Sequence, residues 1–150
     1  MTSIQNTRIF GRDMYFGPRI PPRKRSILPE TDHQKLQQHL GLCEGLRQPS
    51  WTLLAYVLHN KILTTEPIAS LYARDLVTGG CHVTYSVNGG PRQTGLLVHR
   101  ARSGSSSGVI PVASLLGATL IGMRVGQRAP LLSEDGAIMS VSILNVTPPN

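Results

Sequence analysis

Three glycines interrupt an apolar stretch, residues 114–127, two-thirds of the way along the chain. Gly117, four residues and then Gly122 match the start of a phosphate-binding loop, which continues with a lysine and a serine or threonine. Met123 and Arg124 stand in those places, so the groups that would reach the phosphates and hold Mg²⁺ are missing. The residues between the glycines, Ala-Thr-Leu-Ile, favour an apolar helical turn over a loop with exposed amides. We therefore interpret these glycines as structural.

Other reactive side chains form no pattern that supports catalysis or metal binding. Cys43 and Cys81 form no CxxC unit and have no histidine pair near them at zinc-site spacing, so we predict no metal site and no cofactor. The serines at 105–107 lack the context of a nucleophile elbow. His99 lies beside this Gly/Ser-rich loop, which leaves an anion site open as an alternative. The composition of the loop favours a solvated segment.

The first half of the chain predicts helices that must position these residues. Thr31 or Asp32 is a candidate cap for a helix with Leu36 and Leu40 on one face. A second helix is predicted by apolar residues at helical spacing, namely Trp51, Leu54, Leu58 and Ile62. The two predict a short helical hairpin over residues 29–65, and Pro67 is predicted to begin a further helical turn.

The second half of the chain, residues 66–150, has the pattern of a sheet. Apolar residues alternate over 81–87, a turn follows at Asn-Gly-Gly, and residues 92–100 return as a hairpin partner. Pro111 marks residues 109–112 as an edge strand, and residues 137–146 predict the closing strand. Helices followed by strands predict an α+β fold.

The composition indicates a folded protein with a basic arm. Of 150 residues, 40% are hydrophobic and 5% aromatic, and the formal net charge is +7. Residues 1–25 hold six basic residues against one acidic residue, a net +5, and we predict an arm over residues 1–28. Its candidate nucleic-acid-binding residues are Arg19, Arg23, Lys24 and Arg25. No secretory signal and no long apolar run is present, so we expect a cytoplasmic protein that contacts no membrane.

In this context the stretch 114–127 resembles the signature of the C-terminal domain of Gre-type transcription elongation factors. The matching positions are Ser114, Leu116, Gly117, Leu120, Gly122, Val125 and Gly126. The resemblance covers roughly residues 66–150 and implies an FKBP-like fold, in which a curved antiparallel sheet packs on one short helix. With so short a helical hairpin in front, the chain is most similar to the regulator of nucleoside diphosphate kinase (Rnk) branch.

The resemblance also implies where RNA polymerase would bind. Gre-type factors have an acidic residue, a serine and a proline in a surface loop that grips the polymerase, and here Ala113, Ser114 and Leu115 occupy those positions. These three are the candidate polymerase-binding residues, although two of them differ from the family pattern. Leu115 is either an apolar anchor for the polymerase or a residue of the core.

A second departure bears on mechanism. Gre cleavage factors carry paired carboxylates at the tip of a long coiled coil, where two hard oxygen ligands hold Mg²⁺. The corresponding segment here, residues 41–50, holds only Glu44, and each helix is expected to have about 10–13 residues, roughly 15–20 Å. We therefore expect a non-enzymatic regulator, with no small-molecule substrate, that docks at the rim of the secondary channel and competes with Gre factors.

Two alternatives remain from the sequence. The basic arm makes a nucleic-acid-binding module possible. The FKBP-like fold suggests prolyl isomerase activity as a second alternative, and such a site requires an aromatic-lined pocket. After residue 72 the chain has only one aromatic residue, Tyr85, so this second alternative is the weaker.

Overall fold

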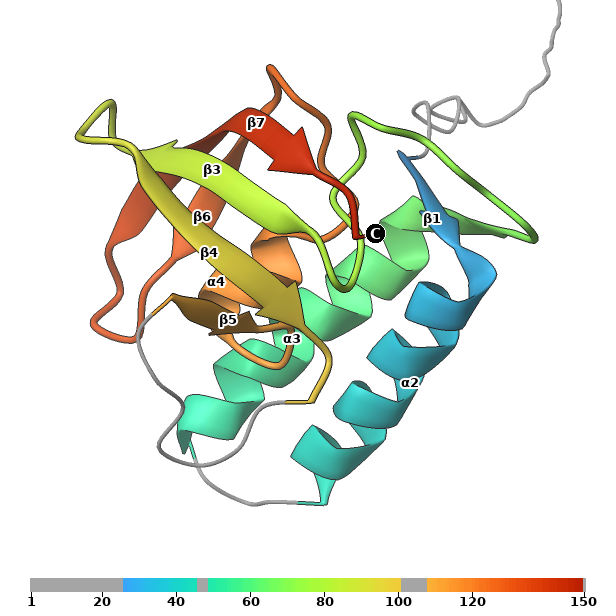
Figure 1. Cartoon of the computed structure of the whole chain (residues 1–150). Helices are drawn as coiled ribbons and strands as arrows, with labels where there is room; N and C mark the ends of the chain where they lie inside the picture. Colours follow the sequence, from blue (N-terminus) through green and yellow to red (C-terminus); the bar gives the residue numbers. More distant parts are fainter. Residues whose placement is uncertain (1–25, 46–48, 101–107, 150) are drawn as a thin grey trace, which may run out of the picture.

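Two helices make up most of the first half of the described chain. The computed structural model describes residues 26–45, 49–100 and 108–149, and Figure 1 shows a helical hairpin of α2 (Glu30–Glu44) and α3 (Pro49–Thr64) beside a curled sheet. The helices have 15 and 16 residues, more than the spacing predicted. α2 continues past Gly41, although a glycine inside a helix costs roughly 1 kcal/mol. Cys43, in the last turn of α2, is buried, and we attribute the continuation to its packing.

The start of α2 differs from the prediction. The residue before the helix is Pro29, which has no side chain that could cap it, and α2 begins at Glu30. Thr31 and Asp32 therefore lie inside the first turn, and neither is the cap that the sequence suggested. Asp32 is buried, and its carboxylate has a different partner, described below.

A two-stranded parallel sheet joins the two ends of the hairpin. β1 (Ser26–Pro29) pairs with β2 (Thr65–Ile68), with Leu28 opposite Pro67. Residues 26–28 therefore belong to the folded part and not to an arm of residues 1–28, and Pro67 lies in a strand and not in a helical turn. The boundary drawn between residues 65 and 66 cuts through β2. The physical reason is the complete burial of Leu28, which carries β1 onto the core.

The main sheet has five strands in the order β5-β4-β3-β7-β6. The strands are β3 (His82–Val87), β4 (Gln93–Val98), β5 (Val109–Pro111), β6 (Arg128–Leu132) and β7 (Ile138–Thr147). The predicted hairpin of β3 and β4 and the closing strand are present. The sheet is mixed and not purely antiparallel, because β4 and β5 run parallel.

Both edges of this sheet carry a proline. Pro111 lies in β5 at one edge, as predicted, and Pro130 lies in β6 at the other. Proline has no N–H to offer to a further strand, so these edges resist pairing with another chain.

One hydrophobic core connects the hairpin to the sheet. α2 packs on α3, α3 packs on the short helix α4 (Leu115–Leu120), and α4 packs on β5 and β6 (Figure 1). The buried cluster includes Leu36, Leu54 and Leu58 from the hairpin together with Val83, Leu97, Leu120 and Ile143. The α+β class is confirmed. In the described residues no helix is both long and apolar enough to cross a membrane.

Candidate functional site

The candidate polymerase-binding residues follow β5 and end at the first residue of α4, and we call them the docking loop (Ala113–Leu115). Ser114 holds it in place: the Ser114 hydroxyl donates to the Pro111 carbonyl oxygen at 2.6 Å and accepts the Gly117 N–H at 3.0 Å. Ser114 is therefore the N-cap of α4. Leu115 follows as the first residue of α4, half-buried and packed against the core. The serine fixes the loop while Leu115 keeps part of its side chain accessible.

Gly117 allows α4 to approach the docking loop closely. A Cβ at this position would lie 1.9 Å from the carbonyl oxygen of Pro111, so any larger residue would push α4 away from β5. Leu120 and Met123 are buried, whereas Leu116 is only partly buried against the same core. The glycine is thus a packing requirement of the turn.

The end of the stretch 114–127 is a turn and not a phosphate cradle. Gly122 has a φ of +86°, a conformation that strongly favours glycine, and Gly126 also has a positive φ. The Gly122 N–H donates to the Val77 carbonyl and the Ile121 N–H to the Gly117 carbonyl. Since these amides are already paired, they are not free for phosphate. Val125 lies exposed on the surface.

Two clefts lie beside the docking loop. One, of about 490 Å³, is lined by His39, Gly41, Leu42, Cys43, Gly45, Trp51 and Ala113. The other, of about 290 Å³, is lined by Trp51, Leu54, Ala113, Ser114, Leu115 and Glu134. Trp51 and Ala113 line both clefts. The docking loop therefore lies on the same face of the molecule as the hairpin tip, by which we mean the end of α2 and the start of α3.

The hairpin tip carries little negative charge. Glu44 is exposed at the end of α2 and is the one acidic residue of segment 41–50. Hard divalent cations are held by several oxygen ligands, and the described residues contain no group of three or more ligating side chains that could hold a metal ion.

A chain of three polar residues, one buried and two half-buried, connects α2 to the end of β4, and the sequence did not indicate it. The His99 Nε2–H donates to Asp32 Oδ1 at 2.5 Å, and Asp32 also accepts the Gly79 N–H at 3.2 Å. His99 Nδ1 is then an acceptor, and His39 Nε2 lies 3.2 Å from it. The planes of the two rings make an angle of 17°, and their centroids are 5.4 Å apart. This separation is about the sum of the N···N distance and the two distances from ring centre to nitrogen, so the rings lie edge to edge and not one above the other. This is the geometry of a direct N–H···N bond and leaves no room for a metal between the rings.

The sequence favoured a solvated loop around His99, and the structure contradicts this prediction for His99 itself. It is half-buried and bonded on both ring nitrogens. Residues 101–107, the remainder of the alternative anion site, lie outside the described residues. Burial, and then the nearby His99 and Lys35, lower the pKa of His39 below its ordinary value of 6.5.

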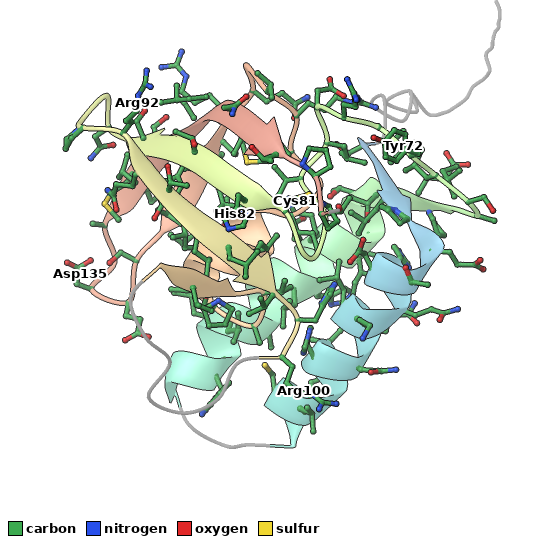
Figure 2. All side chains as sticks on the ribbon, in the orientation of Figure 1. Tyr72, Cys81, His82, Arg92, Arg100 and Asp135 are labelled. Atoms are coloured by element: carbon green, nitrogen blue, oxygen red, sulfur yellow. The ribbon has the colours of Figure 1, made fainter. Side chains whose placement is uncertain are left out.

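The remaining candidates do not gather into a site. Cys81 is buried while its neighbour His82 is exposed (Figure 2), and Cys43 is a second buried free thiol. Arg92 and Arg100 lie at opposite ends of β4 in Figure 2. The candidate nucleic-acid-binding residues Arg19, Arg23, Lys24 and Arg25 lie outside the described residues.

The position of Tyr85 argues against a prolyl isomerase site. Its side chain is 6% exposed and belongs to the core, and the burial raises the pKa of its hydroxyl. It lines neither of the two clefts beside the docking loop. The one aromatic side chain after residue 72 is therefore committed to packing.

The fold is similar to those of solved transcription factors. The prokaryotic transcription elongation factor GreA/GreB from Nitrosomonas europaea matches with a TM-score of 0.58 and 20% sequence identity, over 83% of this chain and 99% of that chain. GreA factor homolog 1 (Gfh1) of Thermus thermophilus and Gfh1 of Thermus aquaticus match with TM-scores of 0.40 and 0.41 and identities of 15% and 13%. Each of these two matches covers 82% of this chain, and they cover 99% and 98% of the respective Gfh1 chains. No protein-family model and no curated protein matches the sequence. The first likeness shows that this chain has the fold of a Gre-type factor.

Proposed function

We propose that this protein binds RNA polymerase through its docking loop, at the rim of the secondary channel, and regulates transcription without stimulating transcript cleavage. The observation that supports the proposal is the docking loop itself: the resemblance to Gre-type factors marks these residues for polymerase contact, and the structure has them at the start of a short helix in a Gre-type fold. Ser114, the one residue of the loop that keeps the family identity, caps α4 and fixes the loop. The short helical hairpin favours the Rnk branch of that family.

The shared face of loop and hairpin supports a binding role. Leu115 is half-buried and lines a cleft with Trp51, so a partner side chain inserted there would contact both elements. Trp51 lines both clefts, and tryptophan is among the residue types enriched at the energetic centres of protein interfaces. Leu115 stands where Gre-type factors have proline, so one apolar side chain replaces another at this position.

The hairpin tip supports the absence of cleavage. Stimulating hydrolysis in the polymerase would require the tip to bring ligands for Mg²⁺ and to orient a water molecule. Segment 41–50 supplies Glu44 alone, and one carboxylate is a weak ligand set for a hard cation. Occupancy of the channel rim without cleavage amounts to competition with Gre factors.

Stalled elongation complexes test this proposal. Full-length protein is added with Mg²⁺, first alone and then in increasing amounts against a fixed amount of a Gre cleavage factor. We expect no shortened transcript from the protein alone and a saturating inhibition of Gre-stimulated cleavage. Shortened transcripts in the absence of a Gre factor would contradict the first half, and undiminished cleavage at saturating protein would contradict the docking.

The charge of residues 1–25 favours a second, weaker function in nucleic-acid binding. Each phosphate contact contributes about −0.9 to the slope of log K against log salt. Deleting residues 1–25 is expected to remove most sequence-independent DNA binding and most of its salt dependence. Equal binding by the truncated protein would assign that affinity to another surface.

A further inference from the structure

Lys61 of α3 points into the contact between α3 and α4. Its Nζ donates to the carbonyl oxygen of Thr119 at 2.9 Å, and its stem passes the Gly122 turn, where a Cβ would lie 3.7 Å from Lys61 Cδ. Thr119 is in the last turn of α4, where carbonyl groups lack a partner within the helix. The ammonium therefore caps the C-terminal end of α4.

This ammonium has no carboxylate partner in the described part of the chain. The one ion pair between permanently charged groups found there joins Arg124 to Asp75, and Asp32 is hydrogen-bonded to His99. Burial without a counter-charge lowers the pKa of Lys61 to about 8, from 10.5. At pH 8 about half of such amines are neutral, against roughly 0.3% of ordinary lysines.

A cavity of about 250 Å³ opens beside the amine. It lies between α3, the end of α4 and β6, and besides Lys61 and Thr119 its lining includes Tyr56, Asn60, Thr64 and Pro130. The docking loop takes no part in it. A small planar group attached to Nζ has room here, with hydroxyl and amide groups nearby.

We propose that Lys61 is a site of acylation by small acyl phosphates. The lone pair of the neutral amine attacks the acyl carbon, an N–C bond forms, and the bond from that carbon to the phosphate oxygen breaks. Phosphate leaves with the bonding electron pair, and the extra proton on nitrogen passes to water. The product is a neutral amide that keeps one N–H for the Thr119 carbonyl.

Acylation removes the positive charge at the C-terminal end of α4 and places an acyl group against β6. The other end of α4 holds Ser114 and Leu115, so the modification acts on the helix that carries the docking loop. This consequence for polymerase rests on the proposed function. The chemistry at Lys61 does not.

The test uses the full-length protein and acetyl phosphate. The chain has three lysines, Lys24, Lys35 and Lys61, and mass spectrometry measures the acetylation rate at each. At pH 8 we expect acetylation of Lys61 to be about tenfold faster than that of exposed Lys35, because its neutral fraction is larger by more than its lower basicity costs in nucleophilicity. In the folded protein the rate at Lys61 should level off above its midpoint near pH 8, whereas in the unfolded chain the rate at the same residue should keep rising.

Two controls separate the effect of the fold from that of the sequence. In urea the ratio of the two rates should fall to about one, since the unfolded chain gives both amines ordinary pKa values. Lys35→Arg should leave the rate at Lys61 unchanged, and Lys61→Arg should abolish that signal in a protein with the same circular dichroism. Acetylation of Lys61 no faster than Lys35 in the folded protein, or an equal preference in urea, would overturn the proposal. None of these readouts depends on polymerase binding.

Discussion

His99 and Asp32, 67 residues apart in the sequence, are joined by a hydrogen bond of 2.5 Å between His99 Nε2 and Asp32 Oδ1. This bond connects α2 to the end of β4 and satisfies a buried carboxylate. We predict that His99→Ala lowers the free energy of unfolding by about 1–3 kcal/mol, because Asp32 then stays buried with only the Gly79 N–H as partner. Urea denaturation measures it.

His82→Ala is the matched control, since His82 is exposed on β3. Its effect should stay within about 0.5 kcal/mol. Equal effects of the two substitutions would show that the bond to Asp32 adds nothing to stability.

The lowered pKa of His39 predicts a loss of stability in acid. The folded state favours neutral His39, whereas the unfolded chain has the ordinary value of 6.5. The contribution is complete above pH 6.5 and is lost as pH falls below 6.5 toward the folded pKa, because the unfolded state then binds more protons. The unfolding free energy of the wild type should therefore fall more steeply between about pH 7 and pH 5 than that of His39→Gln. Parallel curves would contradict the assignment.

The close approach at Gly117 predicts a large effect from one methyl group. Because its Cβ would meet the Pro111 carbonyl oxygen at 1.9 Å, Gly117→Ala should cost about 3 kcal/mol or more through displacement of α4. Gly41→Ala is the control: nothing lies within 4 Å of its Cβ, and in the interior of α2 it should stabilise by about 0.5–1 kcal/mol. Thermal unfolding of both variants decides the matter, and a tolerated Gly117→Ala would refute the packing role.

The proposed docking predicts a binding defect at Leu115. Leu115→Asp should weaken polymerase binding by about 1–3 kcal/mol if this side chain enters the interface, while the circular dichroism remains that of the wild type. Ile138→Asp makes the same change at an exposed position of β7 and should leave binding unaltered. Surface-bound polymerase measures the affinities. Unchanged affinity of Leu115→Asp would remove the docking loop from the proposal.

The sequence by itself determined the elements whose signal is local. The spacing of Leu54 and Leu58 predicts α3, the alternation of Val83 and Tyr85 predicts β3, and a proline within an apolar run marks β5 as an edge. These signals depend on the periods of 3.6 and 2 that side chains follow on helices and strands. The turn at Gly122 was interpretable in the same way, since its backbone conformation is a property of a few neighbouring residues.

The tertiary structure alone decided which distant residues meet. Leu28 reaches the core only because β1 pairs with β2, and no pattern near Leu28 encodes that pairing. The bond between Asp32 and His99 and the bond between Lys61 and Thr119 likewise join separate elements. Each is formed because burial removes water from a polar group, which must then find a protein partner wherever the fold places one. That requirement acts in space and not along the chain, so it leaves no periodic trace in the sequence.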